Sequence, residues 1–145
     1  MVFATNKKAS FDYFLLEKYE VGINLVGTEV KSVRKSKLSI KESYVKIIKD
    51  ELYILNMHIS PYEFGNINNV EETRTRKLLM KKKEIRKLKE KIKEKGLTLV
   101  PVKVYSSGRY VKLEIALSKG KKNYDKRQSL KEKDIKREIR SKLNV

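Results

Sequence analysis

The stretch VPVKVYSSGRYVKLEIAL, residues 100–117, predicts a pair of antiparallel strands and with it the fold. Its first half alternates valine with other residues, and its second half carries aliphatic residues at 111, 113, 115 and 117. Alternation of this kind is typical of a strand with one buried face. Ser106–Arg109 reads as the turn between the strands. Pro101 lacks an amide donor, so its strand is expected to lie at an edge or to carry a bulge.

Further strands are expected earlier in the chain. The aromatic and β-branched stretch from Phe11 to Val26 predicts one or two strands, interrupted by Gly22. Residues 44–48 and 52–55 predict a hairpin around Lys49–Glu51. Together with residues 100–117, these segments indicate a mainly β protein, and we expect a six-stranded antiparallel barrel of the oligonucleotide-binding type.

Two helices are predicted between these strands. Thr28 can cap a short helix over Glu29–Lys35. A longer helix is expected from Thr73 to Lys95, ending at Gly96, because Leu78, Ile85 and Ile92 recur every seven residues.

The last 25 residues differ in composition from the rest of the chain. Residues 121–145 contain ten basic and four acidic groups and few aliphatic side chains. A segment with so little to bury is expected to be disordered in isolation and to fold on a partner. The sequence therefore predicts one domain over residues 1–120 and a basic C-terminal tail over residues 121–145.

The charge of the chain indicates a polyanionic partner. Its 145 residues include 36 Lys or Arg and 18 Asp or Glu, for a formal net charge of +18. Nucleic acid is the leading candidate, and an anionic membrane surface is the second. The absence of cysteine excludes disulfides and thiolate chemistry. No apolar run is long enough for a membrane helix, and no signal-peptide pattern opens the chain, so we expect a cytoplasmic protein.

Catalytic and cofactor motifs are missing from the sequence. His58 is the one histidine, and it has no second ligand at a helical spacing typical of metal sites. The glycines are isolated, which excludes a phosphate-binding loop of the usual pattern. We therefore expect no enzyme activity, no metal and no cofactor.

Two basic stretches are candidate RNA contacts. Arg74, Arg76 and Lys77 are expected at the start of the long helix, as phosphate ligands or as a solvated helix end. In residues 119–127, Tyr124 lies among cations and could stack on a base. No major-groove recognition motif is present, which favours RNA over DNA.

Five strings in order resemble one family, that of the SsrA-binding proteins (small protein B) of bacterial trans-translation. The resemblance covers the chain from Asn6 into the tail. The strings are GTEVKS at 27–32, HISPYE at 58–63, RTRKLL at 74–79, TLVP at 98–101 and KGKKNYDKR at 119–127.

The resemblance implies a fold, a function and a set of contacts. It implies an antiparallel barrel with three helices that binds the tRNA-like part of transfer-messenger RNA (tmRNA) and delivers it to stalled ribosomes, where the nascent chain is tagged. By position it implies RNA contacts at Asn6, Glu20, Leu79 and Lys112. Glu20 and Lys112 could instead be solvent-facing strand residues, and Leu79 could be core.

The resemblance also implies a ribosomal role for the tail of a monomeric adaptor. Tyr124, Asp125, Lys126 and Arg127 match the part of the family's tail that contacts ribosomal RNA near the decoding centre. The stretch from Gln128 to Leu143 matches a helix in the empty mRNA channel, with Ile135 and Ile139 on its apolar stripe. Two alternatives stay open: a generic barrel-type RNA chaperone that binds through backbone charge, and a membrane-surface protein.

Overall fold

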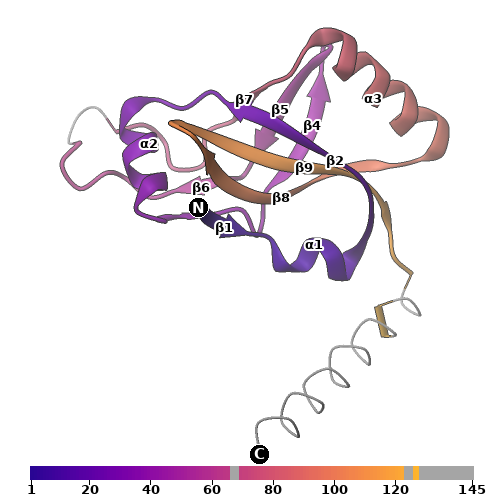
Figure 1. Cartoon of the computed structure of the whole chain (residues 1–145), viewed down its shortest axis with the longest axis horizontal. Coiled ribbons are helices and arrows are strands. Elements are labelled where there is room, and N and C mark those ends of the chain that lie inside the picture. Colours follow the sequence, from indigo (N-terminus) through magenta and orange to yellow (C-terminus); the bar gives the residue numbers. More distant parts are fainter. Residues whose placement is uncertain (66–68, 123–125, 128–145) are drawn as a thin grey trace, which may run out of the picture.

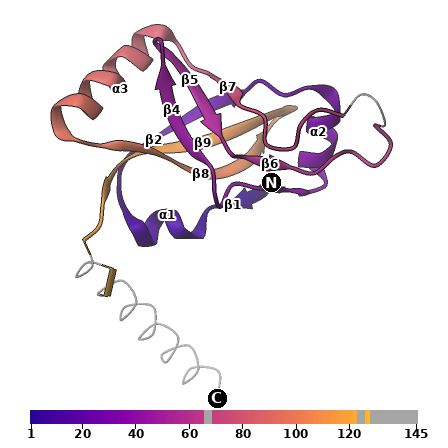
Figure 2. The same ribbon diagram turned by 180° about the vertical axis from the view of Figure 1, so that it is seen from behind.

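The computed structural model describes residues 1–65, 69–122 and 126–127. Within them the chain forms a mainly β fold with three helices (Figures 1 and 2). Seven strands form one antiparallel sheet in the order β1-β8-β9-β2-β7-β5-β4, and two short strands, β3 and β6, pair separately. The strands are β1 Val2–Thr5, β2 Tyr13–Ile23, β3 Leu38–Ser39, β4 Tyr44–Ile48, β5 Glu51–Leu55, β6 His58–Ile59, β7 Arg76–Leu79, β8 Thr98–Ser107 and β9 Tyr110–Gly120. The helices are α1 Lys7–Asp12, α2 Gly27–Arg34 and α3 Lys82–Lys95.

The strand pair predicted from residues 100–117 is confirmed as β8 and β9. Gly108, with φ of 60°, lies in the turn between them, a conformation that glycine adopts without strain. The register shifts between Pro101 and Lys103, so the proline lies at a bulge of an inner strand. The hairpin of β4 and β5 is also confirmed, with Lys49 and Asp50 at positive φ in its two-residue turn.

Helix α1 was not predicted from the sequence, and α2 begins earlier than expected. The stretch expected as strand from Phe11 begins instead with the end of α1, and β2 starts at Tyr13. Helix α2 is capped at Val26 rather than at Thr28. The carboxylate of Glu29 accepts a hydrogen bond from the Val26 amide at 3.1 Å, which satisfies one of the unpaired donors at the helix start.

The long helix predicted over Thr73–Lys95 is wrong in its first third. Residues 76–79 form strand β7, and α3 runs from Lys82 to Lys95 and is capped by Gly96, which has the left-handed φ of 61°. In β7, Arg76 and Leu78 are buried, whereas Lys77 and Leu79 are exposed. Leu78 therefore belongs to a pattern of period two, although it also continues the seven-residue spacing of Ile85 and Ile92.

The expected six-stranded barrel is wrong in its number of strands, and its closure is not confirmed. The main sheet has seven strands, and among the described residues β1 and β4 remain its two unpaired edges. The antiparallel arrangement and the three helices agree with expectation.

The inner face of the sheet carries the hydrophobic core. Leu113 and Ile115 of β9 are fully buried, and they pack with residues from the other strands and with Ile85 and Leu88 of α3. Because side chains alternate along a strand, this burial leaves the neighbouring residues Lys112 and Glu114 on the outer face. None of the helices that the structure describes is both long and apolar enough to cross a membrane.

Candidate nucleic-acid interface

Four residues on adjacent strands form one row across the outer face of the sheet. The strand registers pair Leu79 of β7 with Gly22 of β2, Gly22 with Lys112 of β9, and Lys112 with Tyr105 of β8. Paired residues of an antiparallel sheet lie on the same face. We call Leu79, Gly22, Lys112 and Tyr105 the outer-face row. The register thus brings together two of the residues expected to contact RNA.

Leu79 is an exposed apolar residue, and the glycine beside it makes room for it. Its relative exposure is 55%. A Cβ added to Gly22 would lie 3.2 Å from the Cβ and Cδ1 of Leu79, so the leucine covers the glycine closely. The interpretation of Leu79 as a core residue is therefore wrong, and it is available to a partner.

Glu20 lies beside the outer-face row. It pairs with Glu114 of β9, one step along the same face from Gly22. Glu114 is balanced by Lys18 at 3.6 Å and Lys103 at 3.5 Å. Burial raises the pKa of Tyr105 above its usual value near 10, and a hydrogen bond with Glu20 raises this pKa further. The face therefore offers an exposed carboxylate together with a phenol that stays protonated.

Lys112 and Lys77 add positive charge to this face. The ammonium of Lys112 lies 5.7 Å from the ring centroid of Tyr110, which is 64% exposed. Lys77, two residues before Leu79, forms an ion pair with Glu51, and the hydrogen bond with this carboxylate raises the pKa of Lys77. Cations beside an apolar residue and an aromatic ring can hold phosphate and base at once.

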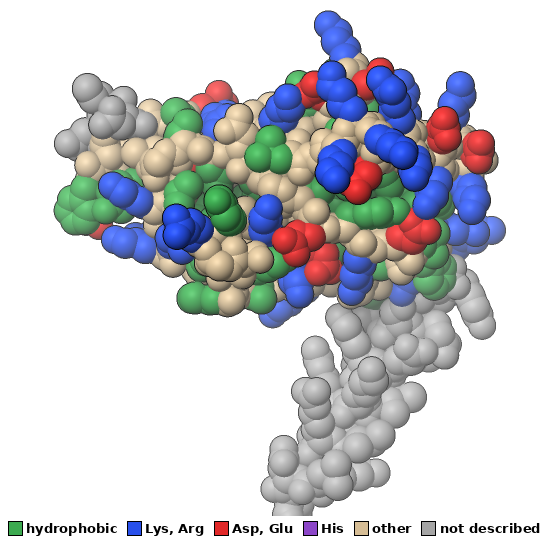
Figure 3. All heavy atoms as spheres, turned by 45° about the horizontal axis from the view of Figure 1, so that its top comes forward, with side chains coloured by type: hydrophobic (Ala, Val, Ile, Leu, Met, Phe, Trp, Pro, Cys, Tyr) green, Lys and Arg blue, Asp and Glu red, His purple; other side chains and the backbone are tan. Residues whose placement is uncertain are grey.

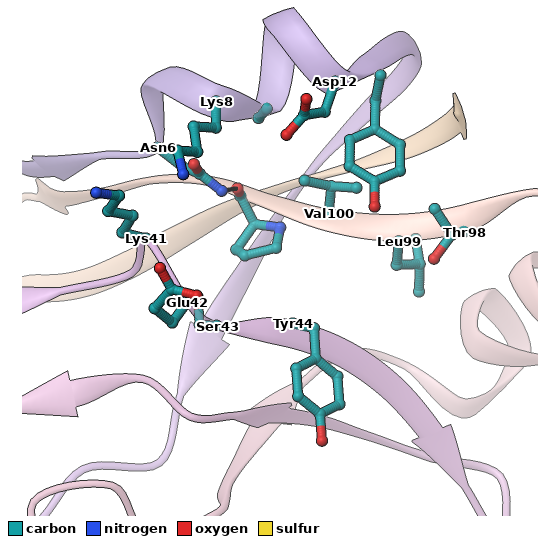
Figure 4. A pocket seen from close by; sticks show the side chains of 13 residues that line it. Asn6, Lys8, Asp12, Lys41, Glu42, Ser43, Tyr44, Thr98, Leu99 and Val100 are labelled. Atoms are coloured by element: carbon teal, nitrogen blue, oxygen red, sulfur yellow. Dashed lines mark hydrogen bonds between the residues drawn. The ribbon is translucent and has the colours of Figure 1, made fainter. Parts of the chain in front are cut away.

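Asn6 lies apart from the outer-face row, at the junction of β1 and α1. It is buried, and its Nδ2 donates to the Pro101 carbonyl at 3.0 Å. Its Oδ1 is buried too and has no hydrogen-bond partner among the residues that the structure describes. Figure 4 shows Asn6 in the wall of a pocket whose rim carries Lys8, Lys41 and Glu42. Any contact of RNA with Asn6 would have to enter this pocket.

Arg76 is a structural residue, and the phosphate contact expected of it is wrong. Its side chain is fully buried, and its Nε donates to Glu29 at 2.6 Å. Its other nitrogens donate to the carbonyls of Met57 at 2.5 Å, Glu72 at 3.0 Å and Arg74 at 3.1 Å. A guanidinium used in this way cannot reach a phosphate on the surface.

Arg74 binds the same carboxylate as Arg76, that of Glu29. Its Nε lies 3.2 Å and its Nη2 lies 2.5 Å from the oxygens of Glu29, and its side chain keeps 27% exposure. Burial raises the pKa of Glu29, but hydrogen bonds from Arg74, the Val26 amide and Arg76 outweigh it and hold this pKa below the usual value. We call Glu29, Arg74 and Arg76 the arginine–glutamate cluster. It joins α2 to β7 and thereby fixes the strand that carries Leu79.

The tail residues are described only in part. Tyr124, Asp125, Ile135 and Ile139 lie outside the described residues. Lys126 forms an ion pair with Asp12 at 3.3 Å, and Arg127 is exposed. The Lys121 amide donates to the Asp12 carbonyl at 2.8 Å, so the chain that follows β9 contacts α1.

His58 pairs with Glu72 at 2.6 Å and lies outside the outer-face row. Within residues 1–65, 69–122 and 126–127, no group of three or more His, Cys, Asp or Glu residues could hold a metal ion. Sequence reasoning missed Tyr105 and Tyr110 as parts of this face. The available signal was Gly22, because a glycine inside a strand pattern often marks a close approach by a neighbouring group.

Comparisons with known proteins show the family to which the chain is similar. The family model described as SmpB protein matches residues 3–145. An SsrA-binding protein of Fusobacterium nucleatum is 55% identical over 140 residues, which are 97% of this chain and 95% of the relative. The SsrA-binding protein of Carboxydothermus hydrogenoformans is 54% identical over 144 residues, 99% of this chain and 97% of the relative. That of Bacillus subtilis is 54% identical over 138 residues, 95% of this chain and 88% of the relative.

A solved structure is similar as well. It is a chain of "tmRNA-SmpB: a journey to the center of the bacterial ribosome", with a TM-score of 0.67 and 44% sequence identity. The match covers 87% of the present chain and 92% of that one.

Proposed function

This chain belongs to the SmpB protein family, and we propose that it binds the tRNA-like part of tmRNA through its outer-face row and delivers that RNA to stalled ribosomes. It is an RNA-binding adaptor of trans-translation and not an enzyme. Its action on ribosomes implies a cytoplasmic location, and we propose that it acts as a monomer.

The observation that carries the proposed contact is the outer-face row together with Tyr110 and Glu20, which lie beside it. An exposed leucine, a lysine and two tyrosines near an exposed glutamate form a surface with apolar, cationic and accepting groups. Folded RNA with unpaired bases is recognised by such combinations, since bases need stacking or apolar partners and phosphates need cations. Glu20 is able to accept a hydrogen bond from a base amino group or a ribose hydroxyl.

Competition binding tests this function. Labelled tmRNA is bound to the full chain at near-physiological salt and challenged with an excess of total tRNA. A specific adaptor keeps the labelled RNA. A generic RNA chaperone would lose it to the competitor, because binding through backbone charge does not distinguish RNAs and weakens steeply with salt. That outcome would overturn the proposal.

Replacement of Leu79 by alanine is expected to weaken tmRNA binding about 5- to 10-fold, from a loss of about 1–1.4 kcal/mol of apolar contact. Because Leu79 is exposed in the protein alone, its unfolding midpoint should stay nearly unchanged. Ile48→Ala, at another exposed aliphatic residue, is the matched control. A large loss of stability in Leu79→Ala, or equal binding by both variants, would contradict the assignment.

For residues 121–145 we propose the ribosomal role that the family resemblance implies. Tyr124, Asp125, Lys126 and Arg127 would contact ribosomal RNA near the decoding centre, and Ile135 and Ile139 would pack in the mRNA channel.

The tail proposal gives a separable prediction. Ile139→Asp should abolish most tagging of nascent chains in a reconstituted translation assay, because a buried unpaired carboxylate is costly. The same variant should bind tmRNA as the unaltered chain does. Ser141→Asp adds the same charge off the stripe and serves as the control. Full tagging by Ile139→Asp would show that the stripe is not used.

A further inference from the structure

A group of aromatic and lysine side chains lies at the end of the molecule formed by α2. The rings of Tyr62 and Phe64 pack edge to face, with centroids 5.6 Å apart. The ammonium of Lys31 lies 5.1 Å from the Tyr62 centroid, and that of Lys35 lies 5.3 Å from Tyr62 and 5.8 Å from Phe64. We call these four residues the aromatic–lysine cluster. None of them belongs to the outer-face row.

The loop that carries the two rings is held in place by its own hydrogen bonds. The Tyr62 amide donates to Asn69 Oδ1 at 2.8 Å, and Asn69 Nδ2 donates to the Tyr62 carbonyl at 3.0 Å. Gly65 is buried against the same amide group, since a Cβ there would lie 2.8 Å from Asn69 Oδ1. These contacts hold Phe64 at a relative exposure of 67%. A phenylalanine held so exposed presents a ring surface to a partner.

The lysines around the rings favour an anionic partner, and Glu63, which lies between the two rings in the sequence, is an exposed acidic residue beside them. Lys31 of α2 has Arg34 three residues later and Lys35, the C-cap residue, four residues later, and residues at these spacings are neighbours on a helix. Glu29, the acidic residue of α2, is buried and engaged by Arg74 and Arg76. Figure 3 shows hydrophobic side chains beside Lys and Arg side chains at the left end of the molecule.

This end of the molecule is continuous with the outer-face row. Arg34 Nη2 donates to the Arg109 carbonyl at 2.6 Å, which ties α2 to the turn between β8 and β9. Both ribbon views show the tip of that hairpin beside α2 (Figures 1 and 2). Tyr110 follows in the chain, and Lys112 lies over its ring. These contacts place α2 next to the turn that leads into Tyr110 and Lys112.

We propose that the aromatic–lysine cluster is a second RNA contact, at which an unpaired nucleotide stacks its base on Phe64 while Lys31 and Lys35 hold its phosphates. Base stacking on an exposed ring, with cations beside it, is the usual mode of binding single-stranded RNA. The inference rests on the proposed function, in that the protein binds RNA. The nucleotide can belong to tmRNA or to ribosomal RNA, which offer the same chemistry.

A tryptophan reporter tests the contact directly. The chain contains no tryptophan, so Phe64→Trp places a single fluorophore at the proposed stacking site. Ile48→Trp, at an exposed residue of the β4–β5 hairpin far from α2, is the matched control. We expect quenching of the Phe64→Trp signal by tmRNA, by protein-free ribosomal RNA, or by both, and little change in Ile48→Trp. The RNA that quenches the fluorescence identifies the source of the nucleotide.

Affinity measurements give an independent readout, with an unstructured RNA oligonucleotide as the probe. Phe64→Ala should weaken binding of this oligonucleotide about 5- to 30-fold, as for the loss of one stacked base. Phe64→Tyr, which keeps an aromatic ring, should bind it as the unaltered chain does. Lys31→Ala/Lys35→Ala should reduce the slope of log affinity against log salt by about 1.4. Lys83→Ala/Lys87→Ala, the same spacing on α3, should leave the affinity for this probe largely unchanged.

Two results would overturn the inference. One is a Phe64→Trp signal that no RNA changes, in a protein that still holds tmRNA against tRNA. The other is a response to intact ribosomes but not to protein-free ribosomal RNA or tmRNA, which would indicate a protein partner. If the unaltered chain itself fails to hold tmRNA, the proposed function fails. The affinity measurements with the unstructured oligonucleotide then still test whether the aromatic–lysine cluster binds RNA.

Discussion

Glu29→Ala is expected to lower the free energy of unfolding by about 3–5 kcal/mol, the usual cost of removing one partner from a buried ion pair. The variant leaves Arg76 fully buried without its carboxylate and removes the acceptor of both arginines. Domains of this size are stabilised by about 5–15 kcal/mol in total, so the variant would lose a large share. It would also loosen β7 and with it Leu79.

Chemical denaturation measures this effect. The matched control is Glu51→Ala, which removes the partly exposed partner of Lys77 and should cost much less, because ion pairs near the surface contribute little to stability. A loss in Glu29→Ala no larger than that of the control would show that the arginine–glutamate cluster does not hold α2 to β7.

Glu29 also affects how the free energy of unfolding depends on pH in acid. The pKa of Glu29 in the folded protein is below its unfolded value of about 4.5. A carboxyl group with a lowered pKa stabilises the fold above its unfolded pKa, and this contribution disappears as the pH falls through the folded pKa. Unfolding free energy should therefore decline below about pH 4.5, and Glu29→Gln should flatten that part of the decline.

Lys112→Glu is expected to weaken tmRNA binding by at least about 30-fold. The variant removes a charge-assisted contact of about 2 kcal/mol and places a third carboxylate next to Glu20 and Glu114 on the same face. Because Lys112 lies on the outer face, the fold should tolerate the change, and the unfolding midpoint should fall little.

Lys46→Glu provides the control, because it reverses an exposed charge on another strand, β4, and gives the same net charge. Specific recognition requires that Lys112→Glu loses much more affinity than Lys46→Glu. Equal losses, with both proteins stripped by tRNA competitor, would indicate that only total charge matters.

The sequence predicted the strands whose pattern was undisturbed and failed where two patterns overlapped. β8 and β9 alternate cleanly, and their turn contains a glycine, so local rules suffice. β7 is short, and Leu78 fits both the alternation of the strand and the spacing of α3. Whether residues 76–79 form a strand or a helix depends on their pairing with β2 and β5, which only the tertiary fold supplies.

In the candidate interface, too, some features could be predicted from the sequence and others depend on the tertiary fold. Charge indicated a polyanionic partner, with nucleic acid as the leading candidate, and the resemblance supplied Glu20, Leu79 and Lys112 as contacts. Composition could not separate Arg76 from Lys77, although one is fully buried and the other is exposed. Their difference follows from the strand period and from the position of Glu29, which lies far away in the sequence but close in space.

The position of β9 has a consequence for how this protein is made. β9 lies between β8 and β2 in the sheet, and its partner β2 was synthesised about a hundred residues earlier. A nascent chain that stops before Tyr110 holds only two separate fragments of sheet, β1-β8 and β2-β7-β5-β4. Folding must therefore wait until nearly the whole chain has left the exit tunnel. Prematurely terminated copies would expose their apolar faces and become substrates for proteases.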